Sequence, residues 1–193
     1  MKALILSAND FEDSELLVPK YRLEEAGYSV DIASVQMGVI RGMHGYEVRV
    51  DKVFAEVAPA EYAVLVLPGG KAPAVIRKDP KVFTIVHHFF GANKPVGAIC
   101  HGPQTLVSAG LLRNRRATCY RTVANELQDA GALYEDSEVV VDGRLVTSRQ
   151  PADLPAFLRE LMKVIAQRDV SAADKYWGEC APIPFEAPIR KQG

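Results

Sequence analysis

Residues 95–103, with the sequence PVGAICHGP, form the stretch that decides the fold. An apolar run leads into Cys100, after which a glycine and a proline open a helical pattern that closes at Gly110. A buried strand that turns sharply into a helix exposes the side chain at the turn, in the arrangement called a nucleophile elbow. The stretch therefore predicts a strand over 95–99, a helix over 101–109 and a reactive Cys100 between them.

Strand and helix patterns alternate on both sides of this elbow. Uninterrupted apolar runs are typical of parallel strands that are covered on both faces, and apolar residues at helical spacing mark the covering helices. Strands are predicted over 2–7, 28–34, 63–67, 95–99 and 116–120, helical faces over 16–26 and 82–90 and after Pro151, and antiparallel hairpins over 38–51 and 138–148. The pattern predicts an α/β fold with an open, mostly parallel sheet between helices.

The length of 193 residues suits a single domain, which we expect to span residues 1–166. The helical pattern lapses from Gln167 onward, where prolines become frequent. We expect residues 167–193 to form a C-terminal extension, an extended arm that lies on the domain or on a neighbouring subunit.

Composition and charge exclude several classes of protein. The 23 Lys and Arg against 24 Asp and Glu give a net charge of −1, which predicts neither nucleic acid nor an anionic membrane as a partner. No apolar run reaches the length of a signal segment or a membrane span. Three cysteines at unrelated spacings predict no disulfide framework and fit no metal template, so we expect a cytoplasmic protein without a metal site.

Cys100 is the candidate nucleophile. The N-terminus of the following helix favours a thiolate, which predicts a lowered thiol pKa. The amide of His101 and an amide of Gly69 or Gly70, after the neighbouring strand, are placed to stabilise an oxyanion. The alternative is that Cys100 is a small buried hydrophobe, as most free cysteines are.

His101 and Glu12 are the candidate proton-transfer groups. His101 has a pKa near neutrality, although it could serve only through its backbone. Glu12 follows the first strand and should reach the same sheet edge, where its carboxyl group could hydrogen-bond the thiolate and shuttle a proton. The alternative is that the acidic run complements a helix dipole, which the residues alone favour for Asp13 and Glu15.

The remaining histidines and cysteines suggest no further site. His87 and His88 point away from the apolar face of their helix, which indicates a solvated surface rather than a metal site. Cys119 and Cys180 have no partner signature, so we expect them to be structural or incidental.

Five separate motifs stand in order along the chain: DFED at 10–13, HGYEV at 44–48, LPGGKAP at 67–73, AICHGP at 98–103 and PADL at 151–154. Together they resemble the ThiJ/PfpI family, both its protease-like and its glyoxalase III and deglycase-like members. The resemblance covers about residues 1–166. It implies a flavodoxin-like three-layer sandwich, related to class I glutamine amidotransferases, that assembles into homodimers or homohexamers.

The resemblance also assigns roles to particular residues. It implies that Cys100 is the nucleophile, that Glu12 is its hydrogen-bonding carboxyl partner and that His101 is the adjacent base. It further implies that the amides of Gly70 and His101 form the oxyanion hole and that Tyr120 lines the pocket.

One departure from the family pattern bears on the reaction. In protease-like members a glutamate follows the GGxAP run and reaches a neighbouring subunit's histidine, whereas this chain has Ala74 there. The triad logic therefore predicts weak peptidase activity. The resemblance favours a cofactor-free enzyme that converts small reactive carbonyls such as methylglyoxal to hydroxy acids such as lactate. The alternatives are a cysteine peptidase or amidase, and a redox-sensing stress protein or chaperone that uses the same cysteine.

Overall fold

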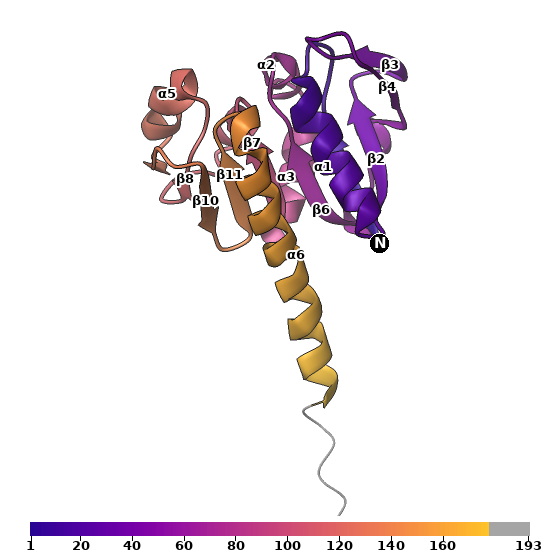
Figure 1. Ribbon diagram of the computed structural model, residues 1–193, viewed down its shortest axis with the longest axis vertical. Coiled ribbons are helices and arrows are strands. Elements are labelled where there is room, and N and C mark those ends of the chain that lie inside the picture. The colour runs from indigo at the N-terminus through magenta and orange to yellow at the C-terminus, as the bar shows by residue number, and fades with distance from the viewer. Residues whose placement is uncertain (178–193) are drawn as a thin grey trace, which may run out of the picture.

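The computed structural model describes the backbone of residues 1–177 and the side chains of residues 1–167 (Figure 1). A seven-stranded sheet runs through its centre in the order β10-β11-β7-β6-β1-β2-β5. Its strands are β1 (Lys2–Leu6), β2 (Ser29–Ser34), β5 (Lys52–Val53), β6 (Tyr62–Leu67), β7 (Val96–Ile99), β10 (Val139–Asp142) and β11 (Leu145–Ser148). All neighbours pair in parallel except β10 and β11, which form an antiparallel hairpin at one edge. The predicted mostly parallel sheet is confirmed.

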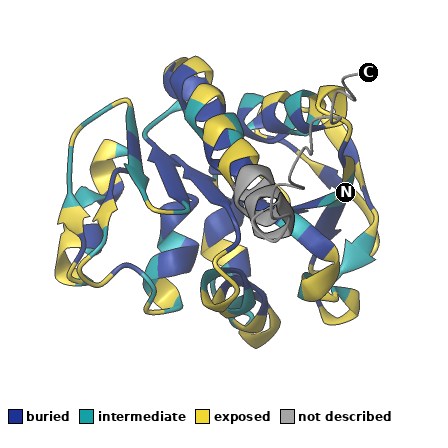
Figure 2. Cartoon of the chain, turned by 90° about the horizontal axis from the view of Figure 1, so that it is seen from below, coloured by how far each residue is buried: buried dark blue, intermediate teal, exposed yellow. Residues whose placement is uncertain are grey.

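Helices cover both faces of this sheet. Figure 1 shows α1 (Asp13–Glu25) and α6 (Leu154–Trp177) on one face, with α3 (Pro80–Gly91) behind the other. The shorter helices are α2 (Ala72–Ile76), α4 (Pro103–Ser108) and α5 (Ala124–Asp129). In Figure 2 the strands between the two helical layers are buried. The flavodoxin-like three-layer sandwich is therefore confirmed.

Two small ribbons lie outside the central sheet. The predicted hairpin after β2 consists of β3 (Gly38–Arg41) and β4 (Glu47–Val50), which pair antiparallel. The strand predicted over 116–120 is only β8 (Arg116–Ala117), which pairs with β9 (Leu133–Tyr134). It is shorter than predicted because the Tyr120 amide donates to the carbonyl of Cys100 at 2.9 Å and the chain then turns.

The apolar strand β7 contains a glycine, Gly97, because α6 packs closely on the sheet at this point. A Cβ atom at Gly97 in β7 would lie 2.8 Å from the ring of Phe157 on α6. Phe157 is fully buried, and burial of such a side chain stabilises the fold by roughly 1.5–3 kcal/mol. Gly97 thus gives the helix its close approach to the strand that carries Cys100.

The last helix extends beyond the predicted domain boundary. α6 continues to Trp177 without a break at Gln167, so the predicted extended arm is wrong for residues 167–177. After Gln167 apolar residues no longer recur at helical spacing. Such spacing marks the buried face of a helix, so its loss does not show that the helix has ended. Residues 178–193, with Cys180, lie outside the described residues.

Within residues 1–177, none of the helices combines the length and the apolar character needed to cross a membrane.

Candidate functional site

Cys100 lies at a sharp turn between β7 and α4, as the sequence predicts. Its φ of +62° is in the left-handed region, which non-glycine residues rarely adopt. Three backbone hydrogen bonds fix the turn: Cys100 N–H to Ser148 O at 3.0 Å, Gly102 N–H to Ile99 O at 2.8 Å and Tyr120 N–H to Cys100 O at 2.9 Å. Strain held by surrounding contacts is a common feature of functional sites.

Gly102 lets the elbow pack against the neighbouring strand. A Cβ atom at this position would lie 2.1 Å from the carbonyl oxygen of Leu67, the last residue of β6. Because the obstructing atom belongs to the backbone, no side-chain movement can relieve the contact. The CHG sequence is therefore needed for the geometry of the turn.

We predict that Gly102→Ala lowers the free energy of unfolding by at least about 3 kcal/mol or prevents folding. The control is Gly91→Ala at the end of α3, where an added Cβ meets no atom within 4 Å. The free energy of unfolding of Gly91→Ala should be unchanged or higher by up to about 1 kcal/mol, since alanine restricts the unfolded chain. Urea denaturation compares the two variants, and equal stabilities would contradict this account of the elbow.

The carboxyl group that faces the thiol is that of Glu15 on α1. Glu15 is fully buried, and its Oε2 accepts the Gly69 N–H at 2.9 Å. A Cβ atom on Gly69 would lie 2.6 Å from Glu15 Oε2 and 2.7 Å from Cys100 Cβ, which shows how closely the two side chains converge. Glu15 also hydrogen-bonds the Cys100 side chain. The sequence reading of Glu15 as a helix-dipole residue is thus corrected.

Burial raises the pKa of Glu15 to about 8, against the opposing hydrogen bond from Gly69. The carboxyl group therefore carries a proton over most of the neutral range. Its Oε1 is buried without an oxygen or nitrogen partner, whereas Oε2 accepts the Gly69 amide. A proton donor thus lies beside the sulfur of Cys100.

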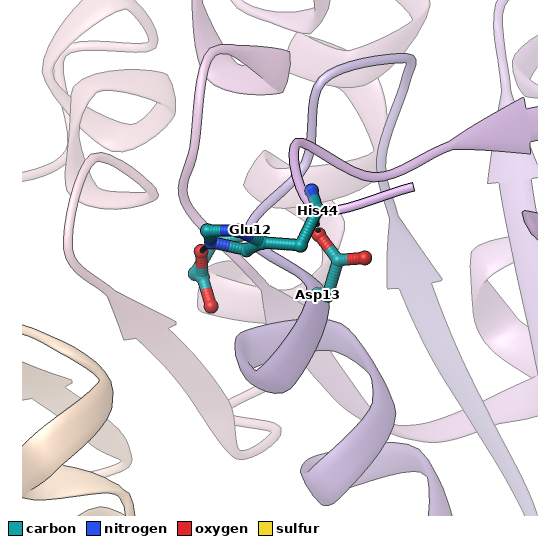
Figure 3. A group of neighbouring side chains, drawn as sticks. All are labelled: Glu12, Asp13 and His44. Carbon is teal, nitrogen blue, oxygen red and sulfur yellow. Dashed lines mark hydrogen bonds and ion pairs between the residues drawn. The ribbon is translucent and has the colours of Figure 1, made fainter. Parts of the chain in front are cut away.

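Glu12, predicted to be the partner of the thiol, instead caps α1. Its Oε1 accepts Ser14 N–H at 3.3 Å and the Ser14 hydroxyl at 2.7 Å, while its Oε2 lies 3.0 Å from His44 Nε2 (Figure 3). A capping side chain turns back towards the helix's own amides, whereas Glu15, one turn later, faces the sheet. Glu12 still lines the cavity above Cys100, so a role in proton transfer remains a prediction.

Glu12, Asp13 and His44 lie together at the rim of the site, with potential ligand atoms within 4.8 Å of one another (Figure 3). The Asp13 carboxylate accepts the N–H groups of His44 and Tyr46, both at 2.9 Å. Each carboxylate oxygen of the cluster thus already has a protein partner. The cluster anchors the β3–β4 turn beside the cavity.

His101 contacts the nucleophile directly. Its Nδ1 lies 3.2 Å from Cys100 Sγ, and its ring stacks on Tyr120 with centroids 5.2 Å apart and planes tilted by 31°. Burial lowers the pKa of His101, and the charge of Glu126 opposes that effect. A neutral imidazole at neutral pH is able to accept the thiol proton, so the geometry favours the base over a purely backbone role.

The predicted lowering of the thiol pKa is contradicted. Burial raises the pKa of the Cys100 thiol, and ionisation of the neighbouring Glu15 adds to the effect, while amide hydrogen bonds from Gly70 and His101 oppose it. The Cys100 side chain is only 7% exposed, and these amides do not offset its burial. The thiol therefore needs a base.

Two of the three proposed oxyanion amides point at the reacting sulfur. The N–H groups of Gly70 and His101 both hydrogen-bond Cys100, which suits the predicted oxyanion hole. The Gly69 amide is taken by Glu15, and this corrects its predicted role. Gly70 has a φ of +75°, and a Cβ there would lie 2.4 Å from the Glu12 amide nitrogen, so only glycine fits.

A cavity of about 490 Å³ opens above these groups. It is lined by Glu12, Met43, Gly70, Lys71, Ala74, Cys100, His101, Gln104, Tyr120 and Pro151. Tyr120 lies in the wall as predicted. The volume admits a small ligand and the wall is mainly apolar, as in most binding sites for small molecules.

Glu15 is a member of the site that the sequence did not predict. Its signal was present, since residues 15, 19 and 23 are spaced by four and share the buried face of α1. Gln104 and Met43 carried no comparable signal, because only the tertiary fold brings them to the cavity. Cys119 is buried and free, as expected for a structural cysteine.

Comparisons with known proteins identify relatives of this chain. The DJ-1/PfpI family matches residues 1–164. Deglycase PH1704 of Pyrococcus horikoshii is 50% identical over 165 residues, which are 86% of this chain and 99% of the relative. Deglycase PfpI of Pyrococcus furiosus is 51% identical over the same shares of both chains.

The fold also matches a solved structure. A two-domain protein from Anabaena variabilis, with DJ-1/ThiJ/PfpI-like and ferritin-like domains, has a TM-score of 0.83 and 34% identity. The match covers 86% of this chain and 48% of that protein, so this chain spans about half of its length.

Proposed function

The chain belongs to the DJ-1/PfpI family, and on that basis we propose that it is a deglycase-type enzyme that acts on small reactive carbonyls through Cys100. Relatives that are half identical over almost their whole length bear the name deglycase. The observation that carries the proposal is the convergence of Cys100, Glu15 and His101 beneath the cavity. We further propose methylglyoxal as a substrate and lactate as its product.

The first step is attack of the thiol on the aldehyde. A C–S bond forms between Cys100 Sγ and the aldehyde carbon as the thiol proton passes to His101 Nδ1. The carbonyl oxygen takes the π electron pair and accepts hydrogen bonds from the Gly70 and His101 amides. Return of the proton from His101 to this oxygen gives a neutral hemithioacetal.

The second step moves hydrogen between adjacent carbons. A base removes the hydrogen of the former aldehyde carbon as a proton, and the oxygen of the neighbouring ketone is protonated, which gives an enediol. A proton is then delivered to the neighbouring carbon as the hydroxyl group on the sulfur-bearing carbon loses its own proton. One carbon is thereby oxidised to a thioester as the other is reduced to an alcohol, so no external oxidant is needed. His101 and Glu12 line the cavity and are placed to move these protons.

Water then attacks the thioester carbon and cleaves the C–S bond. The protonated Glu15, which hydrogen-bonds Cys100, gives the departing sulfur its proton and recovers one from the attacking water, so that lactic acid and the thiol are released.

Peptide hydrolysis is not favoured by this site. Ala74 lines the cavity and offers no carboxylate to orient His101 from a neighbouring subunit. A carbonyl rearrangement needs no amine leaving group and so does not depend on such a triad.

Lactate formation from methylglyoxal without glutathione tests the proposal, with casein hydrolysis measured on the same samples. We expect lactate and little or no casein cleavage. Casein hydrolysis without lactate would identify a peptidase instead. No turnover of either, with Cys100 readily oxidised to sulfinate, would contradict the proposal and favour a redox sensor.

A further inference from the structure

Glu126 on α5 is held beside the cavity by two other helices. Its carboxylate accepts hydrogen bonds from the guanidinium of Arg77, at the end of α2, and from Gln104 Nε2 on α4 at 2.7 Å. Arg77 Nε also donates to the hydroxyl of Ser108 at 2.7 Å. Burial acts to raise the pKa of Glu126, but these donors outweigh it and hold the pKa below its usual value. The carboxylate is therefore ionised and fixed in place.

The network of Glu126 reaches His101 through α4. Gln104 lines the cavity beside His101, and its backbone N–H donates to the backbone carbonyl of His101 at 3.0 Å. The charges of Glu126 and His101 influence each other, since each shifts the other towards its ionised form. The His101 imidazole thus contacts Cys100 Sγ through Nδ1 and stacks on the Tyr120 ring. Both contacts hold it in the electrostatic field of the Glu126 carboxylate.

We propose that Glu126 is a positioning residue that stabilises the imidazolium of His101 within one subunit, with Arg77 and Gln104 holding the carboxylate. Ala74 contributes no charge to this region, so the anion comes from α5 instead. When His101 accepts the thiol proton, the new positive charge forms near an existing negative one. This lowers the cost of forming the imidazolium in a half-buried site.

Other titratable or charged groups surround the His101 ring and must be included in any titration. They are Cys100 at Nδ1, Tyr120 on the ring face, Glu12 and Lys71 across the cavity, Glu15 beneath the sulfur and Arg77 behind Glu126. Arg77 offsets part of the field of Glu126. This gives two variants with opposite expected effects on His101.

Nuclear magnetic resonance titration of the histidine rings tests the proposal without any use of activity. The chain has four histidines, so the spectrum of His101→Gln assigns the His101 signal. We expect Glu126→Gln to lower the pKa of His101 by about 0.5 unit or more, and Arg77→Met to raise it. In Glu126→Asp, which keeps the negative charge, the pKa of His101 should stay close to that of the wild type. Glu135→Gln, which removes an exposed carboxylate paired with Arg116, should leave it unchanged.

The outcomes separate this proposal from the proposed function on which its catalytic meaning rests. An unchanged His101 pKa in both Glu126→Gln and Arg77→Met would overturn it, as would an equal shift in Glu135→Gln. Shifts in the two expected directions support it even if methylglyoxal is not turned over. If lactate is formed, the acid limb of the kcat/KM profile should move with the His101 pKa, a change that a purely structural role would not produce.

Discussion

Glu15→Gln is expected to be more stable than the wild type at pH 8 and to lose about 10²-fold in turnover. The Glu15 carboxyl has a pKa of about 8 in the folded chain, well above that of an exposed carboxyl group, because it is buried. Between about pH 4.5 and pH 8 the unfolded chain therefore binds fewer protons than the folded chain at this residue. Wild-type stability must fall as the pH rises through this window.

Glutamine removes this pH dependence because it stays neutral and can still accept the Gly69 hydrogen bond. The stability difference in favour of Glu15→Gln should be small at pH 4.5 and grow to roughly 2–5 kcal/mol at pH 8. Turnover falls because an amide cannot exchange a proton with the sulfur. Denaturant unfolding across this pH range measures the first effect, and lactate assays measure the second.

Glu24→Gln is the matched control, since Glu24 lies on the same helix but pairs with Lys20 at the surface. It should change neither quantity appreciably. A Glu15→Gln variant that loses stability as steeply as the wild type between pH 4.5 and pH 8 would show that Glu15 is not the protonated group.

Cys100→Ala is expected to lower methylglyoxal turnover by at least about 10⁴-fold while the fold is retained. Cys100 Sγ forms the C–S bond in the first step and keeps it until hydrolysis, so no other group can form the thioester. Alanine fits the space, because the cysteine already has a Cβ atom at this strained φ. The control is Cys119→Ala, a change at the other free cysteine among the described residues, and it should retain most of the activity. Circular dichroism compares the folding of the two variants, and lactate assays compare their turnover. Comparable loss in both variants would indicate damage to the fold instead.

The sequence predicts most of the fold because burial leaves clear patterns. The apolar runs 63–67 and 95–99 and the helical face of α6 report which residues face the core. The strand over 116–120 was overestimated because its strand-like composition does not show where the chain turns at Tyr120, whose amide donates to the Cys100 carbonyl. The continuation of α6 past Gln167 was missed because an apolar stripe marks burial, not helicity.

The site was only partly predictable for a related reason. Cys100, His101 and Gly70 lie at strand ends, which a parallel sheet brings to one edge, and they were found. The choice between Glu12 and Glu15 depended on which side of the first turn of α1 faces the sheet. Glu126 lies 26 residues from Cys100 in sequence and enters only through the packing of α2, α4 and α5. Its position carries no local signal.

The most direct test of the nucleophile is an acid quench of the wild-type enzyme during turnover of methylglyoxal, followed by digestion and mass spectrometry. The account predicts a gain of one substrate mass on the peptide that contains Cys100. The adduct should resist dilution and be removed by hydroxylamine, as a thioester is, and should be absent from the peptide with Cys119. Lactate formation at full rate with Cys100 unmodified would contradict the account.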